Sequence, residues 1–170
     1  MAVTSAVVNI VVNQPGVFDD FEPGIDLSQW SAFGDAAFTL ANANGGSVSP
    51  TRSLWFGGDN TRSATTRSVD TLLGGTIGFQ LRLSNGSGTD WENADLPGEG
   101  VVLEYSVNGG GAWINIATYD TAGAAYTLGW AAQQLSIPAG AQTAAARCAR
   151  PSQTLIGPSA HVRSRRGSEA

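Results

Sequence analysis

The chain of 170 residues lacks lysine altogether and has one cysteine, Cys148, and one histidine, His161. A single cysteine excludes a disulfide within the chain, so the fold cannot depend on one. No histidine lies in residues 1–146. That part of the chain therefore has neither a Ser-His-Asp arrangement nor histidine ligands for a metal.

Charge is scarce and unevenly placed. Charged residues make up 14% of the chain, against about 25% in an average globular domain. Residues 1–146 carry four arginines and thirteen acids, a net charge of −9, whereas residues 147–170 carry five arginines and one acid, a net charge of +4. An acidic body with four arginines cannot form a basic stripe, so nucleic acid is excluded as a partner.

Long apolar runs are also missing. No stretch of about 18 apolar residues occurs, so the chain is not expected to insert into a membrane. No basic region precedes an apolar core at the N-terminus, and a signal peptide is therefore not predicted. Any export signal is expected to lie upstream or to be absent. We also expect the chain to be part of a larger, multidomain protein.

The chain is rich in glycine, with 22 residues, and its apolar residues occur in short runs. Val101, Leu103 and Tyr105 alternate with polar positions, Asn108 to Gly111 form a turn, and a second apolar run follows. Alternation on both sides of an Asn-Gly turn is a strong hairpin signal. Further strands are expected over 6–12, 38–40, 53–56, 63–69, 76–83, 112–119 and 126–137. Many short strands without a clear helix predict an all-β sandwich.

The two ends differ from the body. Residues 1–13 are predicted to be the end strand of a preceding domain or an added strand, followed by a β-sandwich domain over 14–146. Residues 147–170 show no alternation and no aromatic residue. We interpret them as a basic tail that is disordered or read out of frame from a GC-rich gene. A basic tail that binds nucleic acid or an acidic polymer is the alternative.

The order of several pieces resembles the reelin-type subrepeat and its bacterial relatives. The matching pieces are Asp19-Asp20-Phe21-Glu22, Trp30, 53–58, 77–81, the hairpin over 102–110 and Ile137-Pro138. The resemblance implies an extracellular jelly-roll β-sandwich similar to carbohydrate-binding modules. Relatives end with an arginine-rich strand and a strand carrying Trp-Ala-Ile-Asp, a pattern that this chain loses after Gln142. The sandwich is therefore expected to lack its usual last strand, which would leave an unpaired edge.

The hairpin itself resembles an Asp-box, the Ser-x-Asp-x-Gly-x-x-Trp turn of sialidase-type propellers and reelin repeats. Ser106 and Asn108 are expected to bond the turn backbone, Gly110 to take positive φ, and Trp113 to pack beneath. The motif occurs once, whereas a propeller would repeat it. We interpret it as a structural turn.

Calcium is the expected use of the acidic residues, since Ca²⁺ takes six to eight oxygen ligands. The resemblance implies a structural calcium ion near Asp19, Asp20 and Glu22. Asp59 and Asp95 lie in loops that can contribute further oxygens. The alternative is that these acids are solvated turn residues.

A glycan platform is expected at Trp91, which lies with Asp90 and Glu92 in a long polar loop, because pyranose rings stack on exposed aromatic faces. The alternative is that Trp91 anchors this loop against the sandwich. Nothing in the spacing of the acids selects a catalytic pair for glycoside hydrolysis. We therefore predict a non-catalytic extracellular binding or adhesion module, with a glycan or an extracellular protein as partner and a structural calcium ion. An architectural spacer and an accessory domain of a secreted hydrolase are the alternatives.

Overall fold

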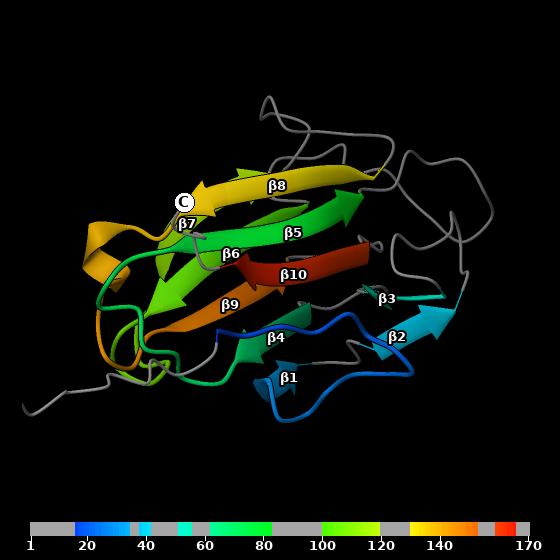
Figure 1. The fold of residues 1–170 in the computed structure, drawn as a ribbon, viewed down its shortest axis with the longest axis horizontal. Coiled ribbons are helices and arrows are strands. Elements are labelled where there is room, and N and C mark those ends of the chain that lie inside the picture. Colours follow the sequence, from blue (N-terminus) through cyan, green and yellow to red (C-terminus); the bar gives the residue numbers. More distant parts are fainter. Residues whose placement is uncertain are drawn as a thin grey trace, which may run out of the picture.

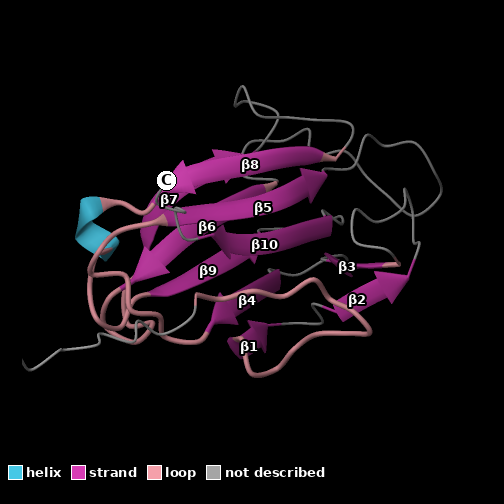
Figure 2. Ribbon diagram, in the orientation of Figure 1, coloured by secondary structure: helices cyan, strands magenta, loops and turns pink. Residues whose placement is uncertain are grey.

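The computed structural model describes residues 16–34, 38–41, 51–55, 62–82, 100–119, 130–152 and 159–165. These residues form ten β-strands and one 3₁₀ helix, η1 (Ala139–Ala141). Figure 1 shows the strands in two layers, and Figure 2 shows how little of the described chain is helical. No helix in the described part is long and apolar enough to cross a membrane.

Each layer is a five-stranded sheet in which neighbouring strands pair antiparallel. The first sheet has the order β1 (Trp30–Gly34), β4 (Arg62–Thr66), β9 (Arg147–Ser152), β6 (Val101–Ser106) and β7 (Ile114–Tyr119). The second has the order β2 (Phe38–Ala41), β3 (Arg52–Trp55), β10 (Ser159–Arg165), β5 (Thr76–Arg82) and β8 (Ala131–Ser136). The all-β sandwich is thereby confirmed.

Alternation along the strands builds the core between the layers. In β5 the residues Ile77, Phe79 and Leu81 are buried, while the positions between them are partly exposed. They pack with Val101, Leu103 and Tyr119 of the facing sheet, and the ring of Phe79 meets that of Tyr119 edge-on at 5.6 Å. Seven of the expected strands correspond to β2 through β8.

A second cluster lies at the other side of the sandwich. Phe21, Trp30, Leu54 and Ala64 are buried there, with Ile25 and Phe33 packed against them. Strand β1, which sequence reasoning missed, supplies Trp30. Its pattern is weak because only Trp30 is buried and the pairing with β4 is irregular between Trp30 and Ala32.

The C-terminal region differs from the expectation of a tail outside the sandwich. Residues Arg147–Ser152 form β9 between β4 and β6, and Ser159–Arg165 form β10 between β3 and β5. Both sheets are therefore completed by residues that we had placed beyond the domain boundary at 146. The physical reason is that interior strands gain hydrogen bonds on both sides, which outweighs weak apolar alternation.

Pro151 is an unusual residue for a strand, because proline has no N–H to donate to the hydrogen bonds between strands. In β9 it is paired with Ser63 of β4, whereas β6 pairs only with Arg147, Cys148 and Ala149. The proline thus lies beyond the end of the β6 ladder, where its missing N–H costs no bond to that strand. The strand predicted over 6–12, and the role predicted for residues 1–13, concern residues outside the described part of the chain.

Candidate functional site

The opening acidic segment is organised around the buried carboxylate of Asp19, which is 3% exposed. Its Oδ1 accepts a hydrogen bond of 2.7 Å from the backbone N–H of Phe21. Its Oδ2 accepts bonds of 2.9 Å from the N–H of Asp26 and 2.7 Å from the indole Nε1 of Trp30. Buried polar groups are costly unless they are bonded. These three donors satisfy Asp19 and fix the loop that leads into β1.

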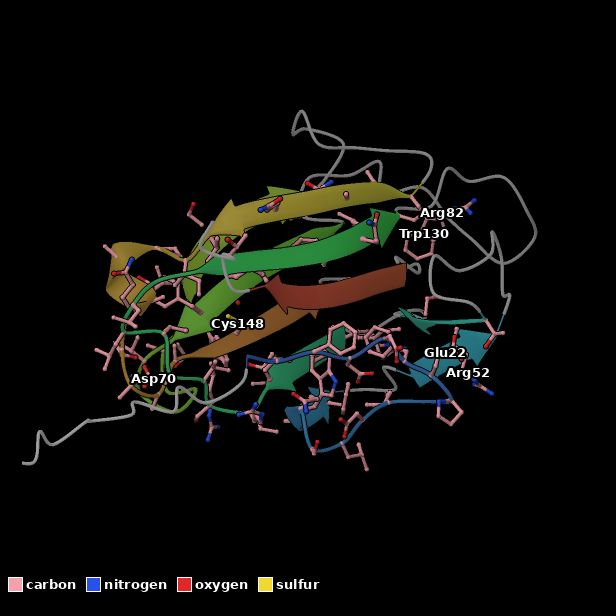
Figure 3. All side chains as sticks on the ribbon, viewed as in Figure 1. Glu22, Arg52, Asp70, Arg82, Trp130 and Cys148 are labelled. Atoms are coloured by element: carbon pink, nitrogen blue, oxygen red, sulfur yellow. The ribbon has the colours of Figure 1, made fainter. Side chains whose placement is uncertain are left out.

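Glu22 ties the same loop to the beginning of β3. Its Oε1 accepts bonds from the backbone N–H groups of Thr51 and Arg52, at 2.8 and 2.6 Å, and its Oε2 accepts one of 2.7 Å from the Thr51 hydroxyl. The hydrogen bond from the Thr51 side chain is the main reason that the pKa of Glu22 lies below its usual value. Glu22 and Arg52 lie together near β2 and β3 in Figure 3.

Asp26 closes the turn that follows. It accepts bonds from the Ser28 hydroxyl at 2.7 Å and the Ser28 N–H at 2.9 Å, and the Ser28 hydroxyl lowers its pKa. A general acid in glycoside hydrolysis requires a carboxyl with a raised pKa. Glu22 and Asp26 are shifted in the opposite direction, so neither is suited to that role.

The predicted calcium ligands were tested against this geometry. Asp19 and Glu22 each face their own set of donors, and Oδ1 of Asp20 accepts the N–H of Glu22 at 3.1 Å. Within the part of the chain that the structure describes, no group of three or more His, Cys, Asp or Glu side chains is placed to hold a metal ion. The opening carboxylates therefore do not fit one shared ion. Asp59 and Asp95 lie outside the described residues, and calcium binding stays a prediction.

The predicted glycan platform of Asp90, Trp91 and Glu92 also lies outside the described residues. The strand ends that flank this part of the chain are described: β5 ends at Arg82 and β6 begins at Val101, while Trp130 lies immediately before β8. Arg82 and Trp130 lie at the same end of the sandwich in Figure 3. The pairing of β5 with β8 also places them there, because Leu81, next to Arg82, pairs with Ala131, next to Trp130.

The β6–β7 hairpin has the internal bonding expected of an Asp-box-like turn. The Ser106 hydroxyl accepts the N–H of Gly110 at 2.9 Å, and Oδ1 of Asn108 accepts the N–H of Ala112 at 2.9 Å. Gly110 has a φ of 97°, and a Cβ built on it would lie 3.5 Å from Trp113. The expected structural turn is confirmed.

The hairpin is also joined to β9. The guanidinium of Arg147 donates from Nη1 to the carbonyl of Gly109 at 3.3 Å and from Nε to the Ser68 hydroxyl at 3.1 Å. Sequence reasoning missed this contact because Arg147 was assigned to the tail. Next to it, burial raises the pKa of the Cys148 thiol to about 11, so the thiol is unreactive near neutral pH.

Comparison with known proteins decides the family. The model of Reelin subrepeat B matches residues 40–150, which is more than half of the chain. The chain belongs to the reelin subrepeat B family. The resemblance seen in the sequence is thereby confirmed.

Two solved structures are similar in fold. A cleaved adhesin domain of Lys-gingipain from Porphyromonas gingivalis shares 15% identity, with a TM-score of 0.57, over 88% of this chain and 97% of that one. A carbohydrate-binding module in complex with β-1,4-galactotriose shares 14% identity, with a TM-score of 0.48, over 89% of this chain and all of the module. The first likeness supports the β-sandwich fold.

Proposed function

We propose that this chain is a non-catalytic extracellular module that binds glycans and serves in adhesion within a larger surface protein. Membership of the reelin subrepeat B family over residues 40–150 is the observation that carries the proposal. The proposal places the binding platform at Trp91, with Asp90 and Glu92 beside it.

The chemistry of the described acids supports a binding role over a catalytic one. Asp19, Glu22 and Asp26 accept hydrogen bonds that hold their own loop and the start of β3. Their role is local structure. A hydrolase would instead need one carboxyl held protonated across a sugar from a second carboxyl.

A glycan array probed with the full chain tests the proposal. We expect binding by the wild type and its loss in Trp91→Ala, because removing an aromatic face removes the stacking surface. Leu73→Ala is the matched control, since Leu73 is an apolar side chain that is 85% exposed in the turn before β5. An identical array profile for wild type and Trp91→Ala would remove Trp91 as the platform.

The array also separates the proposal from the alternative of a spacer domain. A spacer has no ligand of its own, so a folded wild-type chain that binds no glycan would favour that function. Thermal unfolding of the same preparation shows whether the chain was folded when it was tested.

A further inference from the structure

Strand β8 lies at an edge of its sheet. In the part of the chain that the structure describes, β8 pairs with β5 on one side and with no strand on the other. Figure 1 shows β8, in yellow, at the margin of the nearer layer. An edge strand presents N–H and C=O groups to which a further strand can bind, and natural proteins usually block such an edge.

The register of β8 shows which backbone groups point away from the sheet. The N–H of Ile137 donates to the carbonyl of Gly75, just before β5, at 2.9 Å. Hydrogen bonds between two antiparallel strands recur at every second residue, so Leu135 and Gln133 also direct their backbone groups toward β5. The residues between them direct theirs outward: Ala132, Gln134 and Ser136. Among the described strands none pairs with these outward groups.

The usual protections of an edge are missing from β8. The strand Ala131–Ser136 contains no charged residue and no proline, and its register with β5 is regular throughout. The edge strands of the facing sheet differ, because the pairing of β1 with β4 and that of β7 with β6 are each interrupted by an irregularity. Bulges of that kind twist an edge away from further pairing. Strand β2, at the other edge of the same sheet as β8, is regular but has only 4 residues.

The side chains of β8 leave this edge accessible. The three residues whose backbone groups point outward also have exposed side chains. They lie on the outer face of the sheet, because the β5 residues opposite them alternate with the buried Ile77, Phe79 and Leu81. A strand that approaches β8 therefore meets small or neutral polar side chains and no charge.

The edge is also complementary to itself. When two β8 strands run antiparallel about a twofold axis at Gln134, this residue is opposite its own copy, and Ala132 is opposite Ser136 of the other chain. All the outward groups of both strands are then paired, which gives about six backbone hydrogen bonds. A shift of the register by two residues in either direction leaves one of the three residues in each copy without a partner in β8.

The charge of the strand favours a second copy as the partner. Like charges directly opposite one another destabilise a pair of strands, and a twofold axis brings each charge near an identical one. A neutral strand avoids this repulsion in a chain with a net charge of −5. The Gln134 amide, which meets its own copy, can both donate and accept a hydrogen bond. A strand of a different protein could be selected by opposite charge, which β8 does not offer.

We infer that two copies of this chain associate through β8, in an antiparallel pairing centred on Gln134 that makes one continuous sheet across the dimer. The interface is isologous and closed, so the assembly ends at two copies. The inference goes beyond the proposed glycan binding and does not depend on it. A dimer presents two copies of any binding site to one surface, which raises avidity.

Sedimentation of the full chain over a range of concentrations measures the association, with a reductant present to exclude a disulfide through Cys148. We expect a monomer–dimer equilibrium in the wild type. Gln134→Lys places two like charges opposite each other at the twofold axis and should weaken dimerisation about tenfold or more. Gln142→Lys is the matched control, because it makes the same change at an exposed glutamine outside β8. It should leave the dimerisation constant within about twofold, and equal weakening by both variants would overturn the site.

A mixture of two variants tests the pairing itself. Gln134→Glu should also stay monomeric at concentrations where the wild type dimerises. An equimolar mixture of Gln134→Lys and Gln134→Glu should form a heterodimer, because opposite charges then meet at the axis. If both variants are folded by circular dichroism and their mixture stays monomeric, pairing at Gln134 is wrong.

Amide hydrogen exchange of the wild type needs no variant. Exchange at Ala132, Gln134 and Ser136 should slow at concentrations where the dimer forms, whereas the amides of Gln133 and Leu135, which bond to β5, should change little. A dimer in which the first three amides exchange at the rate of the monomer would overturn the inference. So would a wild-type chain that stays monomeric up to about 1 mM, which would leave this edge to a strand of another protein.

Discussion

The indole Nε1 of Trp30 donates a hydrogen bond of 2.7 Å to Oδ2 of Asp19, and both residues are buried. This bond joins the acidic loop at the beginning of the domain to β1. It also supports the second core cluster, because the Trp30 ring stacks on Phe21 with centroids 6.1 Å apart. The loop and the core of this half of the sandwich are therefore one structural unit.

Replacing Asp19 with asparagine is expected to lower the free energy of unfolding by about 2–4 kcal/mol. The amide loses the negative charge and one acceptor atom, so a buried N–H donor is left without a partner. Urea denaturation at neutral pH measures the change. Asp20→Asn is the matched control, because Asp20 is only partly buried, and its loss should stay below about 1 kcal/mol. Equal losses would contradict the central role of Asp19.

Calcium binding can be tested with Asp19→Asn and with variants of the loop acids. An ion that binds only the native state stabilises it by RT ln(1 + [L]/Kd) and so raises the midpoint of thermal unfolding. Because the oxygens of Asp19 already accept three N–H groups, we expect Asp19→Asn to lower the midpoint equally in calcium and in chelator. A larger loss in calcium would show that Asp19 is a ligand and that its hydrogen bonds are secondary. A calcium response in the wild type that Asp59→Asn or Asp95→Asn removes would support the ligands predicted from the loops.

Glu22 is expected to make the protein less stable in acid. Its folded pKa lies below the usual value of 4.5, mainly through the Thr51 hydroxyl. A depressed folded pKa contributes stability above the unfolded pKa, and this contribution is lost as pH falls through the folded pKa. Urea denaturation at a series of pH values below about 4.5 should therefore show a shallower decline for Glu22→Gln than for the wild type.

The Thr51 hydroxyl supplies a control for this titration. In Thr51→Val the two backbone donors to Glu22 are kept while the hydroxyl donor is lost. The pKa of Glu22, followed by NMR of its carboxyl carbon, should rise toward 4.5 in this variant. An unchanged pKa would show that the hydroxyl does not stabilise the carboxylate.

The hairpin depends on the backbone freedom of Gly110. A residue with a side chain is strained at a φ of 97°, so Gly110→Ala should cost about 1–2 kcal/mol of unfolding free energy. Gly24→Ala is the control, because an added Cβ there meets nothing within 4 Å and φ is not positive. Equal stabilities of the two variants would contradict the strained turn.

The sequence predicted β2 through β8 because each of these strands alternates apolar and polar residues or borders a clear turn. It could not predict β9 and β10, because their residues lack an alternating apolar pattern. These two strands are held by pairing with a neighbouring strand on each side. The acids of the opening segment could be found in the sequence, whereas the hydrogen bonds that Asp19 and Glu22 accept could not. The same residue types, Asp and Glu, accept hydrogen bonds from backbone N–H groups in one protein and bind a metal in another. Only the positions of Thr51 and Trp30 distinguish them.

Cys148 offers a direct test of β9. At pH 8 a thiol with a pKa of about 11 has about 100-fold less thiolate than one at the usual 9.0, and the thiolate is the reactive species. Alkylation of the native chain by iodoacetamide should therefore be about 100-fold slower than in urea, and slower still because Cys148 packs against the core. Moving the thiol to exposed Ala145, as Cys148→Ala with Ala145→Cys, should restore fast labelling. Labelling of wild-type Cys148 at the rate seen in urea would place residues 147–152 outside the sheet and restore the interpretation of a tail.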